Sequence, residues 1–408
     1  MKELFRVIDL DDLEKIGNLK TEAHSKVKST KYFPIYNIDG KTMIFKPLSK
    51  TKPLTTPFFA YSEVYWSYVI NKYFDKNAPR YYLAISSEIE KEQPKYYRKG
   101  VLVESLTQNN ETLTNLYDYF VQKQEDTINI KDYINYCMTN YDYTKILQSE
   151  FIKNNRKIGE KLAYQILLSI LRQDRNFHYE NINFIEDDNS FYLAPPIDFE
   201  FSIPFLYPDK LEEYNDEQKR YIYNLNIEMN NDNKSILYKY LTKEEKLKFS
   251  GTITRNICLI IKLYPNVVGE FINNLDKFIE DVNGFNFSDK DNYIESLNSD
   301  YWKIGHALYK ENDKDKAEKL KEKILLEDVD KDKVFERIKQ DILDFSKLYS
   351  LTLKTYLLSY YNGIEDLELM TICDLLDKLN ISKEDYLNNK EEIVKLELRK
   401  ISKNIYLK

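Results

Sequence analysis

The feature that most constrains the fold of this chain is an ordered run of a helix, a polar loop, a hairpin and an acidic residue. Apolar residues recur at helical spacing through 156–173, which predicts a largely buried helix. The polar loop that follows contains Asp174 and Asn181. The helix therefore delivers the chain to Asp174.

The segment between Asn181 and Asp198 predicts a β-hairpin. Residues 182–186 and 191–194 are rich in strand-forming side chains, and a turn-rich polar stretch lies between them. Because the two ends of a hairpin lie close together, we expect Asn181 and Asp198 to be able to share one metal ion through oxygen ligands.

An Asp, an Asn and a second Asp in this order match the polar groups that phosphoryl transfer to a hydroxyl requires. One carboxylate orients the nucleophile, while the Asn and the other carboxylate hold Mg²⁺ against the phosphates of ATP. Taken alone, Asp174 is equally typical of a helix C-terminal turn with a surface ion pair, and Asp198 of a strand end. The order of the elements, with a hairpin between them, favours the catalytic interpretation.

A cation for the phosphates is expected upstream, in a second hairpin. Residues 32–36 and 41–46 flank Asp39-Gly40, and Asp-Gly is a strong hairpin turn. Alternation places Lys46 on the strand face opposite to the Met and Phe side chains. A lysine at a strand end is ordinarily only solvated.

Glu63 favours a functional role for Lys46. It is the one acid in the apolar, helix-like segment 58–70. If this helix packs on the sheet, Glu63 can pair with Lys46 and fix it for the α- and β-phosphates. The alternative is that Ser62 or Glu63 only lies near a helix N-terminus, where the helix dipole favours it.

The apolar strand 100–104 precedes a polar stretch and a helix from about Glu111. In a two-lobed nucleotide-binding fold, the backbone around Val103 and Glu104 would hydrogen-bond adenine at this junction. Glu104 is equally interpretable as an ordinary strand-end charge.

These motifs resemble those of the HipA-like serine/threonine kinases, whose fold is related to that of the phosphoinositide 3/4-kinases. The likeness rests on Lys46, Glu63, the loop from Asp174 to Asn181 and the run Leu193-Ala-Pro-Pro-Ile-Asp198, and it covers roughly residues 30 to 205. In that family a His lies three residues before the metal-binding Asn, as His178 lies before Asn181. The resemblance implies ATP and Mg²⁺ as cofactors and a protein as the substrate. Its toxin branch implies an antitoxin-like partner.

The chain departs from the family pattern at the catalytic base. The family places the Asp two residues before the His, where this chain has Asn176. Either the loop carries an insertion and Asp174 is the base, or Asn176 has replaced it and the protein is a pseudokinase. Loops absorb insertions at low cost, and the Asp174-Arg175 pair is also found in the phosphoinositide-kinase relatives, so we favour Asp174.

The segment 18–31 occupies the place of a phosphate-cradling loop, but it contains no glycine. Close backbone approach to phosphate is what glycine supplies, so lysines and hydroxyls would have to substitute, unless this is only a basic surface loop. HipA-like kinases can be silenced by phosphorylation of this loop. The resemblance therefore implies autophosphorylation at one of three hydroxyls, namely Ser25, Ser29 or Thr30.

The net charge and the cysteine content limit which other kinds of protein this chain can be. The net charge of -7 argues against general nucleic-acid binding, so no direct nucleic-acid partner is expected. The three widely spaced cysteines indicate neither a zinc site nor a disulfide framework and fit a reducing cytoplasm. No signal peptide and no membrane-spanning run are visible, so we expect a cytoplasmic protein without a membrane partner.

The sequence thus predicts an α+β, bilobal protein-kinase-like fold with a small β-rich N-lobe and a mostly helical C-lobe. We expect an N-lobe over 1–104, a C-lobe with the catalytic loop and metal site over 105–310, and a helical C-terminal subdomain over 311–408. The alternatives are a nucleotide-binding pseudokinase, or a kinase for lipid or small-molecule hydroxyls that uses the same polar groups.

Overall fold

The structure is a computed structural model of the chain. It describes residues 4–22, 30–49, 57–93, 96–107, 111–116, 118–119, 142–174, 177, 181–187, 190–199, 202, 251–287, 293, 304, 307–308, 311–325, 331–370 and 372–382.

The chain divides into two compact units, each made of three separate segments of sequence. Unit 1 comprises Met1–Leu113, Ile185–Leu211 and Gly284–Lys339, and unit 2 comprises Thr114–Phe184, Glu212–Asn283 and Gln340–Lys408. The contiguous domains expected from the sequence, 1–104, 105–310 and 311–408, stay a prediction.

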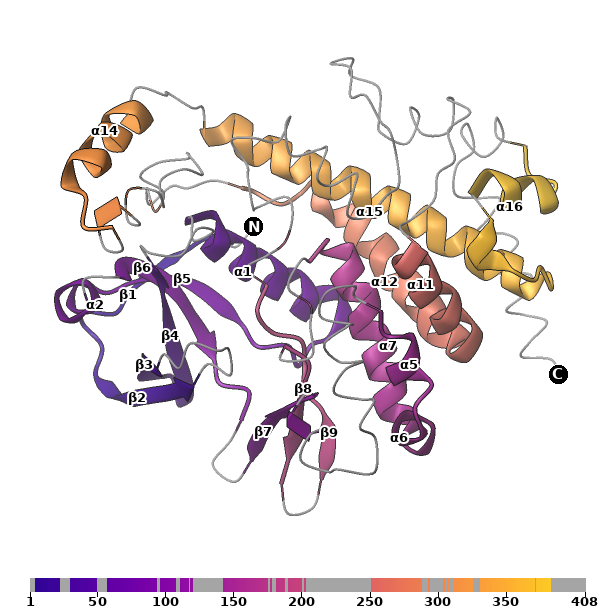
Figure 1. Ribbon diagram of the computed structural model, residues 1–408, viewed down its shortest axis with the longest axis horizontal. Coiled ribbons are helices and arrows are strands. Elements are labelled where there is room, and N and C mark those ends of the chain that lie inside the picture. The colour runs from indigo at the N-terminus through magenta and orange to yellow at the C-terminus, as the bar shows by residue number, and fades with distance from the viewer. Residues whose placement is uncertain are drawn as a thin grey trace. The chain divides into compact units, whose positions relative to one another are not determined.

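Unit 1 contains a six-stranded sheet in the order β1-β5-β6-β4-β3-β2 (Figure 1). Strand β1 pairs with β5 in parallel, and the other neighbours are antiparallel. The strands are β1 Val7–Asp9, β2 Lys15–Glu22, β3 Thr30–Ile38, β4 Lys41–Ser49, β5 Tyr81–Ile85 and β6 Tyr96–Glu104.

The predicted hairpin around Asp39-Gly40 is confirmed as the β3–β4 connection. Ile38 lies opposite Lys41, and both turn residues have positive φ, 53° for Asp39 and 79° for Gly40. Positive φ at both positions is the type I′ geometry, which matches the twist of the flanking strands. The turn therefore fixes the register, and with it the strand face on which Lys46 lies.

Alternation along β4 separates an apolar face from a mixed one. Met43 and Phe45 are buried in a core cluster with Tyr36 and Leu102, as the period of a strand requires. The short helix α2 Ser87–Glu92 contributes Ile89 to this cluster. Lys46 follows Phe45 and so lies on the opposite face.

Helix α1 Pro57–Val69, which a π-helical turn η1 Ile70–Phe74 extends, packs against β5 and β6. Its composition is apolar on nearly every side, as expected of a buried helix. Tyr61 makes edge-on or tilted ring contacts with Phe5, Tyr293 and Phe335. The predicted helix 58–70 is thus confirmed, and residues from the last segment of unit 1 complete its packing.

The structure corrects the two ends of the expected loop 18–31, since residues 18–22 and 30–31 lie in strands. Strand β2 continues to Glu22 and pairs with β3, which begins at Thr30. Strand β2 lies at the edge of the sheet, and its mixture of small, charged and apolar residues does not show the clear alternation that would predict a strand. Residues 23–29, with Ser25 and Ser29, lie outside the described residues.

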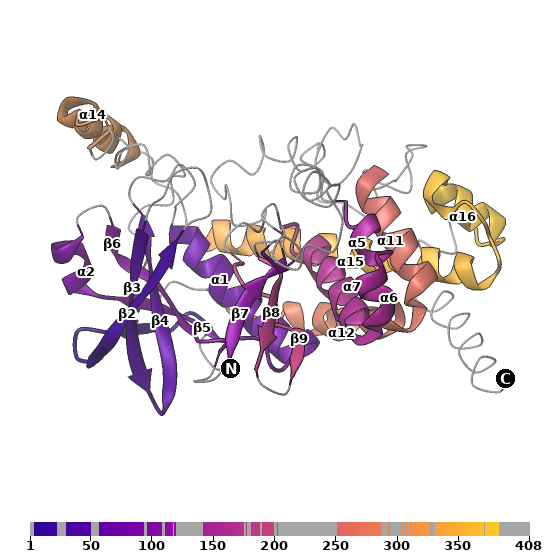
Figure 2. The same cartoon turned by 60° about the horizontal axis from the view of Figure 1, so that its bottom comes forward.

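A second sheet has the order β7-β8-β9 (Figure 2). Its strands are β7 Thr112–Asn115, β8 Asn183–Glu186 and β9 Phe191–Leu193. The expectation of a helix from about Glu111 is therefore wrong at residues 112–115, which form β7. Between β8 and β9, the Asp187 backbone N–H donates to the Ser190 carbonyl at 3.0 Å, and the Ser190 N–H donates to the Asp187 carboxylate at 2.6 Å. The predicted hairpin ahead of Asp198 is confirmed.

The described part of unit 2 is mainly helical. Helix α7 is the predicted buried helix, and Gly159 within it faces Tyr264 so closely that a Cβ would lie 2.2 Å from the Tyr264 hydroxyl. Helix α15 runs through the unit boundary at Lys339. The helices are α5 Thr144–Leu147, α6 Glu150–Asn154, α7 Arg156–Leu171, α11 Gly251–Leu263, α12 Pro265–Val282, α15 Lys331–Tyr361, η3 Leu367–Leu369 and α16 Ile372–Lys378, with α14 Lys314–Leu325 in unit 1.

The predicted α+β class is therefore confirmed, with an N-terminal sheet followed by a mostly helical C-terminal part. Within the described residues, none of the helices combines the length and apolar character needed to span a bilayer.

Candidate functional site

Lys46 of β4 meets two carboxylates within unit 1. Its Nζ lies 2.8 Å from Glu63 Oε1 and 2.5 Å from Asp198 Oδ1. The side chain of Lys46 is 32% exposed and that of Asp198 22%, whereas Glu63 is only 2% exposed. The predicted ion pair between Lys46 and Glu63 is confirmed, and Asp198 joins it.

Glu63 is held from two directions. Its Oε1 accepts from Lys46, and its Oε2 accepts the Phe199 backbone N–H at 3.0 Å. Buried carboxylates require such partners because desolvation of a charge is costly. Helix α1 begins at Pro57 and has no acid in its first turn, so the alternative that Glu63 lies at a helix N-terminus is wrong.

The residues after Asp198 are bound to helix α1. Ser62 Oγ donates to the Phe199 carbonyl at 2.5 Å, and Trp66 Nε1 donates to Ser202 Oγ at 2.7 Å. Asp198 itself has φ of 60°. This left-handed conformation is unfavourable for a non-glycine residue and persists only where surrounding contacts hold it. These bonds provide that fixation.

Tyr81 of β5 completes the surroundings of Asp198. The Tyr81 hydroxyl accepts the Asp198 backbone N–H at 3.4 Å, and its ring lies 5.4 Å from the Phe199 ring. Burial, followed by the charge of Glu63, raises the pKa of Tyr81 well above its usual value, so the phenol stays neutral at physiological pH. Sequence reasoning missed Tyr81 and Trp66, because no local pattern links β5 or a buried indole to a segment so distant in sequence.

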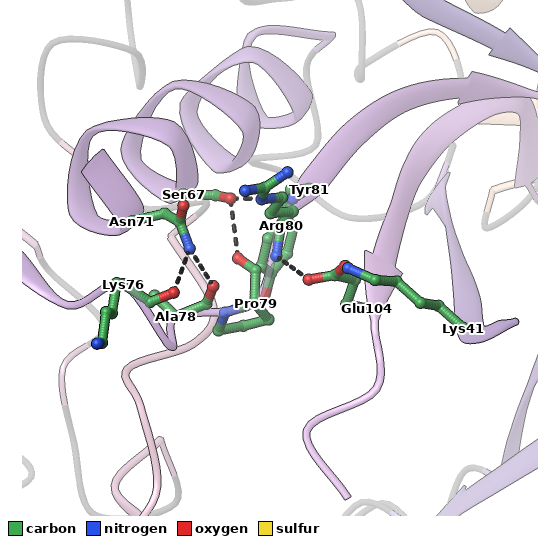
Figure 3. Close-up of polar contacts among 9 residues, drawn as sticks. All are labelled: Lys41, Ser67, Asn71, Lys76, Ala78, Pro79, Arg80, Tyr81 and Glu104. Carbon is green, nitrogen blue, oxygen red and sulfur yellow. Dashed lines mark hydrogen bonds and ion pairs between the residues drawn. The ribbon is translucent and has the colours of Figure 1, made fainter. Parts of the chain in front are cut away.

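Glu104 lies at the end of β6 and has its own partners (Figure 3). Its Oε2 accepts the Arg80 backbone N–H at 3.2 Å, and its Oε1 pairs with Lys41 Nζ. The Glu104 backbone N–H donates to the Arg80 carbonyl at 3.1 Å. Val103 lies in the sheet between Ile44 and Tyr81. These contacts favour the interpretation of Glu104 as a strand-end charge, and adenine recognition by Val103 and Glu104 stays a prediction.

Helix α1 and its extension also anchor the chain that enters β5 (Figure 3). Ser67 Oγ donates to the Pro79 carbonyl at 2.9 Å and accepts the Tyr81 backbone N–H at 2.9 Å. Asn71 Nδ2 donates to the carbonyls of Lys76 and Ala78, both at 2.9 Å. Two serines of one helix, Ser62 and Ser67, thus hold two different segments.

Asp174 and Asn181 belong to unit 2. Helix α7 ends at Leu171, Gln173 follows with φ of 52°, and the Asp174 N–H donates back to the Ser169 carbonyl at 3.0 Å, a Schellman-type ending. The Asp174 carboxylate lies 2.7 Å from Arg172 Nη2, and both side chains are 1% exposed. The helix C-terminal turn expected at Asp174 is present, but its carboxylate is buried with Arg172 and not on the surface. The placement of Asp174 and Asn181 relative to Lys46 and Asp198 stays a prediction.

Several other candidate residues lie outside the described residues, among them Arg175, Asn176 and His178. Within the part of the chain that the structure describes, no group of three or more His, Cys, Asp or Glu side chains is arranged to hold a metal ion.

Comparison with known proteins gives only distant similarity, and only to solved structures. No protein-family model and no curated protein matches the sequence. Among solved structures, the Helicobacter pylori proinflammatory kinase CtkA is similar at 14% sequence identity and a TM-score of 0.36, with 79% of this chain and 100% of that chain covered. A likeness this loose does not assign a family or a function to this chain.

Proposed function

We propose that the chain is an ATP- and Mg²⁺-dependent kinase that transfers the γ-phosphoryl group to a Ser or Thr hydroxyl of a protein. The observation that carries the proposal is the position of Lys46 between Glu63 and Asp198 at 2.8 and 2.5 Å. A lysine fixed by a helical glutamate, with a metal-binding aspartate opposite, is the arrangement that orients nucleotide phosphates in kinases.

The three side chains differ in exposure, and this difference suggests a different role for each. Lys46 and Asp198 are partly exposed, so a ligand can reach both, while Glu63 is buried and contacts Lys46 and the Phe199 N–H. In this proposal Lys46 contacts the phosphates, and Glu63 holds Lys46 in place.

The donor set fits Mg²⁺. Magnesium usually takes one or two carboxylates together with waters and phosphate oxygens, so it does not need a cluster of three acidic side chains. Asp198 supplies a hard oxygen ligand that solvent reaches, and Asn181 is the second proposed ligand. When bound, the metal neutralises charge on the phosphates during transfer.

Asp174 is the proposed group that orients the acceptor hydroxyl, but its surroundings favour a second candidate function. Its carboxylate is buried and paired with Arg172, and an acceptor must come within hydrogen-bond reach of the base. This burial supports a nucleotide-binding pseudokinase, which would keep Lys46 and Asp198 and transfer nothing.

The motifs around His178 and Asn181 make a HipA-like enzyme the specific form of the proposal. An antitoxin-like protein partner belongs to that form, and co-purification with the product of a neighbouring gene would test it. A lipid or small-molecule acceptor is the remaining variant, which a panel of acceptors would distinguish.

Transfer of label from radiolabelled ATP tests the proposal. The unmodified protein should label itself or a protein acceptor, and Asp198→Asn should reduce the rate by about 10²- to 10³-fold. Asp187→Asn is the matched control, because Asp187 binds Ser190 in the hairpin turn, and it should retain activity. A thermal shift with Mg-ATP but no transfer would indicate the pseudokinase, and neither response would refute both.

A further inference from the structure

Three side chains of helix α1 bind the Asp198 segment, which is defined here as Asp198, Phe199 and Ser202. Glu63 accepts the Phe199 N–H, Ser62 donates to the Phe199 carbonyl, and Trp66 donates to Ser202. At about 100° per residue, Trp66 lies about 40° and Glu63 about 100° around the helix from Ser62, so the three side chains fall within an arc of about 100°. One flank of α1 thus carries all three contacts.

Both backbone polar groups of Phe199 are bound by consecutive residues of this helix. The Phe199 side chain is fully buried, and its ring packs against Tyr81. A residue held through its N–H, its carbonyl and its ring has little freedom to rotate, and it directly follows Asp198 with its strained φ of 60°. The contacts of Phe199 therefore determine where the Asp198 carboxylate lies relative to Lys46.

We propose that Ser62 is a positioning residue that sets the Asp198 carboxylate against Lys46 by fixing the Asp198 segment on helix α1. The consequence for metal binding rests on the proposed function, whereas the consequence for the position of the segment does not. Ser62 is a more informative position to change than Glu63, because its side chain carries no charge. A change at Glu63 would also disturb the charge balance of Lys46.

The chain offers a matched control in Ser67. Both serines lie in α1, both are buried, and both make hydrogen bonds to the backbone. Ser67 binds the segment that enters β5. Strand β5 is also held by its backbone pairing with β1 and β6. Both Ser62→Ala and Ser67→Ala should lower the melting temperature, and Ser67→Ala at least as much, because Ser67 loses two hydrogen bonds and Ser62 one.

Two readouts separate the serines. Trp66 is one of two tryptophans in the chain, so its indole N–H signal can be assigned in an NMR spectrum with a Trp302→Phe variant. Ser62→Ala should shift or broaden the Trp66 signal, because the acceptor Ser202 lies in the released segment. It should also raise the Mg²⁺ concentration for half-maximal activity roughly tenfold, the loss expected when a buried carbonyl loses its donor, at an unchanged KM for ATP in saturating Mg²⁺. Ser67→Ala should change neither.

Equal effects of both alanine variants on the two readouts would overturn the proposal, as would a shifted Trp66 signal with an unchanged Mg²⁺ requirement in an active enzyme. If the unmodified protein neither binds nor uses Mg-ATP, the proposed function fails and the Trp66 signal alone decides whether Ser62 fixes the segment. If Ser62→Ala does not fold, Ser202→Ala releases the segment from its other end and should raise the Mg²⁺ requirement relative to Ser67→Ala.

Discussion

Unit 1 and unit 2 each contain a close cluster of opposite charges, and the clusters differ in how far water reaches them. Lys46 in unit 1 lies between Glu63 and Asp198 and is about a third exposed, at 32%. Arg172 and Asp174 in unit 2 are as close, at 2.7 Å, but each is 1% exposed. Distance alone therefore does not distinguish a ligand site from a structural ion pair.

Access makes that distinction. A buried pair gains stability only while both partners are present, because a single charge left in the interior is strongly unfavourable. A partly exposed pair can exchange one partner for a ligand at a lower cost. The exposure of Lys46 and Asp198 supports their proposed contact with a ligand, and the burial of Arg172 and Asp174 supports the pseudokinase alternative to the proposed role of Asp174.

The largest expected effect comes from Arg172→Met. It leaves the Asp174 carboxylate buried without its cation, which should lower the free energy of unfolding by about 3–5 kcal/mol. Urea unfolding measures the loss, and Arg172→Met with Asp174→Asn should recover part of it. The exposed pair of Lys316 with Glu311 is the control, and Lys316→Ala should change the free energy of unfolding far less. A similar small loss for Arg172→Met would show that the pair is not structural.

The next effect is on activity. Lys46→Met should reduce phosphoryl transfer by about 10²- to 10³-fold, because a preorganised cation is removed from the developing charge. Its stability loss should be smaller than that of Arg172→Met, since solvent already screens Lys46. Lys15→Met, on the edge strand β2, should keep full activity. Lys46→Met with an unchanged transfer rate would remove the functional side of the comparison.

Alkaline pH tests burial in both units at once. Burial raises the pKa of Tyr81 in unit 1 and of Tyr349 in unit 2 well above the usual value. The folded chain therefore keeps protons that the unfolded chain releases, and this stability is complete below about pH 10 and is lost as pH rises further. In Tyr349→Phe, the free energy of unfolding should fall less steeply above pH 10, by about 1.4 kcal/mol per pH unit. Chemical unfolding at pH 9, 10 and 11 measures the slope.

The smallest effect is expected for the pair of Lys41 with Glu104. Lys41 is mostly exposed, so Lys41→Ala should cost about 1 kcal/mol or less. Glu104→Ala should cost more, because the Arg80 N–H also loses its acceptor. A double-mutant cycle with unfolding free energies separates the two contributions, and a larger loss for Lys41→Ala would reverse this assignment.

The features that the sequence predicted are those with a local pattern. Asp39-Gly40 specified a hairpin, alternation along β4 specified the face of Lys46, and apolar spacing specified α1 and α7. Once α1 is expected to lie on the sheet, Glu63 is its one acid that can reach Lys46. These inferences need only the period of a helix or strand.

The features that escaped prediction depend on contacts between distant segments. The hydroxyl contacts of Ser62 with residue 199 and of Tyr81 with residue 198 leave no trace in either local sequence. The partners of Glu104 lie on two other strands or strand entries. The burial of Asp174 could not be inferred either, because an Asp-Arg-rich helix end is typical of surface turns.

The ring contacts of helix α1 have a consequence for synthesis of the protein. Phe335 packs against Tyr61 and Phe5, so the ribosome must produce most of the chain before the N-terminal sheet and its helix acquire their last packing partners. At about 5–20 residues per second this interval lasts on the order of tens of seconds. During it, an apolar aromatic surface is exposed on the nascent chain, and a chaperone that shields such surfaces would determine how much protein matures.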